Sequence, residues 1–94
     1  MIIKYYVETE KGKVLVRTSA NEYKYALVDS EHIVEGRRGL YCCSGSYENI
    51  AKQYNYWKNI NVENYKYWLE KGNQEKANYD LARANNLKIV ELVK

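Results

Sequence analysis

The only side chains in this sequence that could serve as soft nucleophiles or metal ligands are two adjacent cysteines and a single histidine. Cys42 and Cys43 are neighbours, and His32 and Asp29 precede them in the chain. A thiol beside a histidine that a carboxylate orients would be the arrangement of a thiol-dependent enzyme. Free cysteines are more often simply buried, and a zinc site requires three or four ligands. We therefore expect no catalytic residue, no bound metal and no cofactor.

A second candidate site is the turn at residues 36–39, which carries the consecutive arginines Arg37 and Arg38 between two glycines. Two guanidinium groups on a flexible turn can bind a phosphate or a carboxylate in a bidentate way, and the backbone amides of the turn could add donors. The glycines do not have the spacing of a phosphate-binding loop. An ordinary solvated turn is therefore the simpler interpretation.

Tyrosine is the most unusual component, with 11 copies among 94 residues and no phenylalanine or proline. Each tyrosine hydroxyl needs water or a polar partner, so several rings should be partly exposed, as in binding surfaces. At about 100° per residue, Tyr56, Tyr67 and Tyr79 lie outside the apolar stripes of their predicted helices. Lysines, among them Lys52 and Lys66, are interspersed with these rings. Together with the two arginines they predict a contact surface; isolated rings covered by lysine stems are the alternative.

The N-terminal half is predicted to form strands. Residues 2–9 alternate in polarity, residues 10–13 supply a hairpin turn with Gly12 in the left-handed region, and residues 14–17 return. Residues 19–29 fit either a strand or a capped helix, and their aromatic and β-branched content favours the strand. Residues 40–43 predict another short strand, on which adjacent cysteines point to opposite faces and stay unbonded.

The C-terminal half is predicted to form three helices and a final strand. The first helix covers about residues 46–58, and the second, about 62–71, is capped by Asn61 and stopped by Gly72. The third covers about 74–85, with Asn73 as its cap and a left-handed asparagine at its end. Residues 87–93 return to the sheet as a strand. The predicted class is α+β: a small, mainly antiparallel sheet (a hairpin, one or two further strands, and the C-terminal strand) with about three helices packed on one face.

Length, charge and composition narrow the class of protein further. The 94 residues fit one domain, residues 1–94, and the net charge of +3 arises entirely in residues 49–94. This excess of positive charge is smaller than is usual for nucleic-acid-binding domains. Without a signal-like or membrane-spanning apolar run, and with two reduced thiols, we expect a soluble cytoplasmic protein. Abundant Asn, Lys, Tyr and Ile have AT-rich codons, which suggests a low-GC bacterium or its phages.

Three hypotheses for function follow. The first is a small non-enzymatic protein that binds another protein; as a phage or mobile-element accessory protein it would inhibit a host enzyme such as a defence nuclease, in the anti-CRISPR manner. The second is a nucleic-acid-binding module that uses the basic, tyrosine-rich surface. The third and weakest is a thiol-dependent enzyme. Pairing of an edge strand, residues 2–9 or 87–93, with a second copy would give a homodimer, and the sequence leaves this open.

Overall fold

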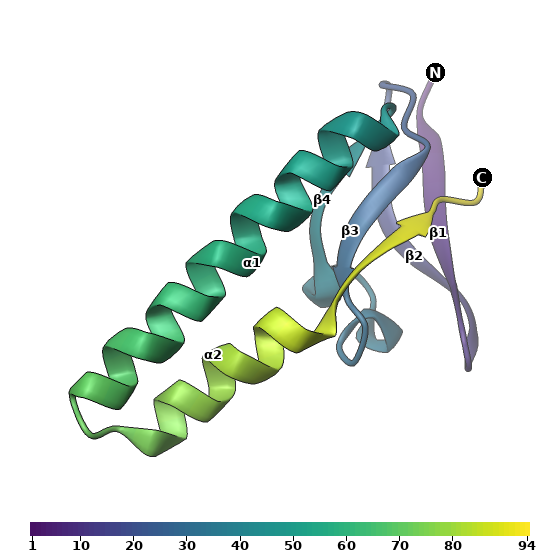
Figure 1. The fold of residues 1–94 in the computed structure, drawn as a ribbon. Helices are drawn as coiled ribbons and strands as arrows, with labels where there is room; N and C mark the ends of the chain where they lie inside the picture. Colours follow the sequence, from purple (N-terminus) through teal and green to yellow (C-terminus); the bar gives the residue numbers. More distant parts are fainter.

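The computed structural model describes residues 1–94 and contains five strands, two helices and two short 3-10 turns (Figure 1). Strands β1 (Ile3–Thr9) and β2 (Gly12–Ser19) form an antiparallel hairpin. Strands β3 (Tyr25–Asp29), β4 (Leu40–Ser44) and β5 (Leu87–Glu91) form a second antiparallel sheet in the order β4-β3-β5. Helices α1 (Tyr47–Glu70) and α2 (Gln74–Asn86) lie between β4 and β5 in the chain. The predicted α+β class and the strand at residues 25–29 are confirmed.

The three-stranded sheet is the middle layer of the fold. Alternate residues of β3 point to opposite faces, so Ala26 and Val28 pack with Val7 and Val16 of the hairpin. On the other face, Leu27 packs with Ile50 of α1 and with Leu87 of β5. The helices therefore cover one face of this sheet, as predicted, and the hairpin covers the other face. Cys42 packs on the helix side and Cys43 on the hairpin side, so the cysteines do point to opposite faces.

The hairpin is joined to the other sheet by hydrogen bonds as well as by packing. Gly12 has a φ of +103°, which a glycine adopts without strain, and it forms the predicted turn. Tyr6 and Val93 exchange two backbone hydrogen bonds of 2.7 and 2.8 Å. The buried Tyr5 hydroxyl donates to the Asn21 carbonyl and accepts from the Tyr23 amide at 2.7 and 2.9 Å. Phenylalanine could fill the same space in the core but could not form these two hydrogen bonds to the backbone.

The predicted helix boundary near residues 58–62 is wrong, because α1 runs without interruption from residue 47 to residue 70. No glycine or proline lies within this segment, and asparagine lowers helix propensity without breaking a helix. Asn61, the expected cap, is instead buried in the middle of the helix. The molecule therefore has two helices rather than three. Ser46 caps α1 by accepting from the Asn49 amide at 3.3 Å.

The turn between the helices follows the sequence prediction, but the end of α2 does not. Gly72 has a φ of +73°, and Asn73 caps α2 by accepting from the Lys76 amide at 3.1 Å. At the other end, no residue except glycine has a positive φ, so the predicted left-handed asparagine is wrong. Leu87 enters the extended region directly, with φ −62° and ψ 132°. Since β5 starts at once, the chain needs no reversal there.

The two helices form an antiparallel hairpin that extends beyond the sheet (Figure 1). Ile50, Tyr54 and Trp57, in the first half of α1, pack against the sheet. The turn between the helices lies far from the strands, and the molecule measures 49 × 28 × 18 Å. The far half of the helical hairpin is therefore free on most sides, which makes it accessible to a partner. Neither α1 nor α2 contains an apolar stretch of the length that a membrane-spanning helix needs.

Candidate functional site

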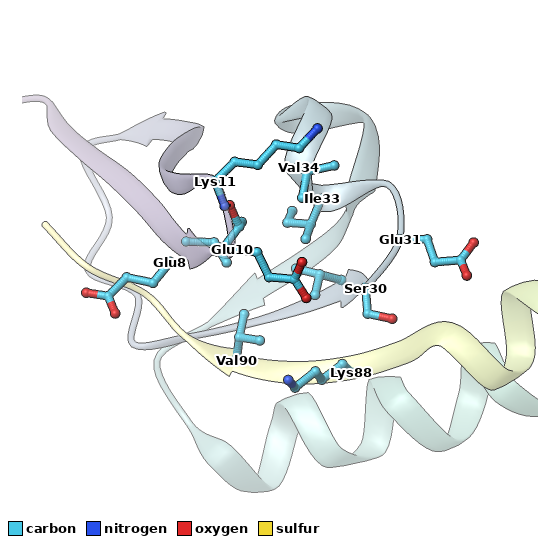
Figure 2. A pocket seen from close by; sticks show the side chains of 12 residues that line it. Glu8, Glu10, Lys11, Ser30, Glu31, Ile33, Val34, Lys88 and Val90 are labelled. Atoms are coloured by element: carbon cyan, nitrogen blue, oxygen red, sulfur yellow. The ribbon is translucent and has the colours of Figure 1, made fainter.

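A cavity of about 730 Å³ lies between the tip of the β-hairpin and β5 (Figure 2). Its floor is apolar and its rim carries charges of both signs that are exposed to solvent. No buried polar group in it lacks a hydrogen-bond partner, and none of the predicted contact residues lines it. Its rim carries Glu8, Glu10, Lys11, Glu31 and Lys88. The predicted contact residues gather instead on the helical hairpin.

The three tyrosines predicted to lie outside the apolar stripes, Tyr56, Tyr67 and Tyr79, are each at least 50% exposed. Tyr67 follows Tyr56 by eleven positions on one continuous helix, which places the two residues about 20° apart around the axis of α1. Tyr79 lies on α2, which packs beside α1 in the hairpin. Because α1 is unbroken, the two rings lie on the same edge of one helix. Two separate helices would not have aligned them.

A chain of contacts connects Tyr56 to Tyr79 across three elements. The Tyr56 ring lies edge-on to Trp57 at 5.5 Å between centroids, and Trp57 lies edge-on to Tyr41 of β4 at 5.4 Å. The Nε and Nη2 groups of Arg83 on α2 donate to the Tyr41 hydroxyl at 3.0 and 2.8 Å. The Arg83 guanidinium also lies 5.8 Å from the centroid of the Tyr79 ring. Tyr41, on the sheet, therefore lies at the middle of this series of contacts, and the series restrains the side chains of Tyr56 and Tyr79 at its two ends.

Tyr67 belongs to a second aromatic group nearer to the end of the helical hairpin. Its ring lies 4.9 Å from that of Trp68, and both rings line a cavity of about 720 Å³ together with Tyr79. Tyr79 thus lies between the two groups. We call the combined surface the aromatic face; it consists of Tyr41, Tyr56, Trp57, Tyr67, Trp68 and Tyr79.

A smaller cavity of about 230 Å³, which we call the arginine pocket, adjoins Tyr79 on the side of the sheet. It receives Arg83 from α2 and Arg38 from the 3-10 turn Arg37–Gly39. That turn depends on Gly39, because a Cβ there would overlap the backbone of Ile33. The pocket is lined by Asp29, His32, Arg38, Tyr41, Tyr79 and Arg83.

The arginine pocket has an excess of positive charge. Neither Arg38 nor Arg83 forms a salt bridge, whereas the Asp29 carboxylate accepts from the backbone amides of Glu31 and His32 at 3.0 and 3.2 Å. Partial burial, the largest single effect, lowers the pKa of Arg83, but the hydrogen bond to Tyr41 and the electrostatic interactions with Tyr41, Tyr79 and Asp29 together outweigh it and raise that pKa above its ordinary value. The guanidinium is therefore charged and held in place. Such a pocket suits a carboxylate or a phosphate.

The remaining predicted residues lie outside this site. Arg37 is exposed and does not line the pocket that Arg38 lines. Lys52 pairs with Glu48 at 3.9 Å, but an exposed pair of this kind contributes little to stability. Lys66 is exposed and forms no hydrogen bond or salt bridge. The structure thus brings Arg38 and Tyr67 to opposite sides of Tyr79 and connects Tyr56 to this group through edge-on ring contacts. Arg37, Lys52 and Lys66 lie outside it.

Sequence reasoning missed Tyr41, Trp57, Trp68 and Arg83. The i, i+4 spacing of Tyr79 and Arg83 on one helix was a signal that these two side chains share a face. Tyr41 had no such signal, because its partner Arg83 lies 42 residues away in the chain. Its role depends on the position of α2 relative to the sheet, which brings Arg83 to the Tyr41 hydroxyl.

The two thiols do not have the environment of a catalytic nucleophile. Burial raises the pKa of Cys42, and the neighbouring Cys43 raises it further. Burial also raises the pKa of Cys43, although Arg17 acts in the opposite direction. His32 Nδ1 lies 3.2 Å from Asp29 Oδ1, yet no hydrogen bond joins this pair to either thiol. No group of three or more His, Cys, Asp or Glu side chains could hold a metal ion.

Alkylation by iodoacetamide measures the state of these thiols. Because burial raises both pKa values, we expect the folded protein to react more slowly at pH 7 than the denatured chain. The reaction rate should rise with pH and reach half of its maximum at a higher pH in the folded protein than in the denatured chain. Mass spectrometry of quenched samples gives both rates. A folded-state rate at pH 7 that exceeds the denatured rate would instead indicate an activated thiolate.

No family model matches the chain, and neither the curated proteins nor the solved structures include a significant match to it.

Proposed function

We propose that this chain is a non-enzymatic binding protein that contacts a protein partner through the aromatic face and the arginine pocket. The observation that carries the proposal is the continuity of exposed tyrosines with half-buried Tyr, Trp and Arg side chains around Tyr79. These are the residue types that most often dominate binding energy at protein interfaces. Tyrosine and tryptophan also lose little conformational entropy on binding, since each has only two side-chain torsions.

A protein partner fits this surface better than a nucleic acid does. Lys76 and Lys71 lie against the rings of Trp68 and Tyr67, at 4.4 and 5.6 Å from the centroids, so these rings already contact cations of the chain itself. The same cavity includes the carboxylates of Glu75 and Asp80, which would repel a phosphodiester backbone. Nucleic-acid binding remains the second hypothesis, supported by the unpaired arginines of the arginine pocket.

The further hypothesis, that the partner is a host enzyme such as a defence nuclease and that binding inhibits it, derives from size and composition. The identity of the captured partner tests it. If the partner is an enzyme, its activity should fall in the presence of the purified protein, and an unchanged activity would reject inhibition.

A tagged pull-down from a low-GC bacterial lysate, with and without nuclease treatment, tests the proposed function. We expect a stoichiometric protein that survives nuclease treatment. Replacing both pocket arginines (Arg38→Gln with Arg83→Gln) should weaken capture by about tenfold or more, since each charge-assisted hydrogen bond contributes about 1.5–3 kcal/mol. Arg37→Gln is the matched control, because Arg37 is adjacent to Arg38 but lies outside the pocket.

Two outcomes would contradict the proposal. Material that disappears on nuclease treatment, with an affinity that falls steeply with salt, would support the nucleic-acid hypothesis instead. Equal loss of capture in Arg37→Gln and in the double variant would show that general positive charge, rather than the arginine pocket, determines binding.

A further inference from the structure

Asp80 of α2 is a largely buried residue whose carboxylate has no partner within the fold. The residue is 9% exposed, and its carboxylate forms no hydrogen bond or salt bridge, while its oxygens remain accessible to solvent. Asp80 lines the cavity of about 720 Å³ that also includes Tyr67, Trp68 and Tyr79. An accessible carboxylate without a counter-ion in the wall of an aromatic cavity suits a ligand of opposite charge.

The aromatic walls of this cavity already attract cations. The ammonium of Lys76 lies 4.4 Å from the centroid of Trp68, and that of Lys71 lies 5.6 Å from the centroid of Tyr67. Lys76 precedes Asp80 by one helical turn, yet its ammonium stays on the indole and forms no ion pair with the carboxylate. Of the charged residues that line the cavity, Glu75 and Asp80 are acidic and Lys76 is basic, so the lining has a net negative charge.

We propose that this cavity, the Asp80 pocket, binds an arginine side chain of the protein partner. A planar guanidinium can bond to a carboxylate through two N–H groups while its face stacks on an aromatic ring, which an ammonium cannot do. The Asp80 carboxylate is the counter-ion, and Trp68, together with Tyr67, is the stacking wall. The incoming guanidinium displaces Lys76 from the Trp68 ring.

This inference rests on the proposed function and adds to it the chemistry of the partner. The arginine pocket has an excess of positive charge and the Asp80 pocket an excess of negative charge, and both are lined by Tyr79. The partner surface therefore presents an acidic group and an arginine on opposite sides of the site that contacts Tyr79. Opposite charges on the two surfaces would fix the register of the complex.

A titration of the isolated, isotope-labelled protein with N-acetyl-arginine methylamide tests the pocket without the partner. We expect saturable NMR shifts at the Trp68 indole and the Asp80 amide. Asp80→Asn should weaken binding about tenfold or more, and Lys76→Gln should strengthen it several-fold, because the indole face becomes free. Glu70→Gln, which removes an exposed carboxylate outside the cavity, and the neutral N-acetyl-norleucine methylamide are the controls.

Thermal unfolding provides a second readout. Because Asp80→Asn keeps the size of the side chain and removes no contact within the fold, it should leave the Tm nearly unchanged. A lower Tm would show that the carboxylate has a stabilising partner within the fold, and it would overturn the inference. Equal probe affinity in Asp80→Asn and the wild type would also overturn it.

The two proposals fail in different ways. If the wild type does not bind the arginine probe but still captures its protein partner, the Asp80 pocket is rejected and the proposed function stands. If the probe binds and no nuclease-resistant partner is captured, the pocket stands as a guanidinium site and the proposed function is rejected.

Discussion

Simultaneous replacement of Tyr56, Tyr67 and Tyr79 by Ala is expected to weaken partner binding by about 100-fold or more. Each ring is exposed in the free protein, and truncation of an aromatic contact residue commonly costs about 1 kcal/mol or more, which adds to about 3 kcal/mol for three. The fold should survive, since exposed substitutions typically change stability by about 0.5 kcal/mol or less each. Isothermal titration with the captured partner measures affinity, and circular dichroism checks the fold.

Tyr47→Ala is the matched control for this experiment. Tyr47 is a tyrosine of the same helix and is 58% exposed, but it lies at the start of α1 and packs edge-on against Tyr25 at 5.4 Å. It therefore lies outside the aromatic face. An unchanged affinity in the triple variant, or an equal loss in the control, would show that the aromatic face is not the contact surface.

Ile50→Ala is expected to reduce the free energy of unfolding by about 2–5 kcal/mol, the range measured when a large aliphatic side chain is removed from a core. Ile50 is the only fully buried apolar residue of α1, and it packs with Leu27 and Leu87 of the sheet. Its loss leaves a cavity at the centre of the contact between α1 and the strands. Urea unfolding followed by far-UV circular dichroism gives the difference in free energy.

The control for the core substitution is Ile2→Ala, which removes the same atoms from an exposed position. We expect a change of about 0.5 kcal/mol or less there. If Ile50→Ala destabilises no more than this control, the packing of α1 on the sheet is wrong. A destabilised helix–sheet contact would also loosen the arginine pocket, because Tyr41 is on the sheet and Arg83 is on α2.

The features that could be predicted from the sequence are those that depend on neighbouring residues. The β1–β2 hairpin follows from alternating polarity and from a glycine at the turn, and Gly72 and Asn73 mark the helix ends because their effects act within one turn of backbone. The exposure of Tyr56, Tyr67 and Tyr79 was also predictable, since rotation around a helix axis is a property of spacing alone.

The break predicted near Asn61 shows where local rules end. An asparagine in mid-helix can cap a new helix or continue the old one, and the two outcomes differ little in local free energy. Packing of α1 against α2 along the whole hairpin selects the continuous helix, and it buries Asn61 in the process. That choice in turn aligns Tyr56 with Tyr67, so the aromatic face exists only because tertiary packing overrode a local signal.

The sequence alone accounts for the α+β class, the hairpin, the turn between the helices and the exposed tyrosines, because these depend on spacing and on backbone conformation. Which side chains meet depends on the tertiary structure. The fold places Arg38 in a pocket and leaves the adjacent Arg37 outside, joins Tyr41 to Arg83, and sets Asp80 in a cavity wall without a counter-ion within the fold. Contacts across many residues of chain depend on the packing of whole elements, and neither composition nor periodicity records that packing.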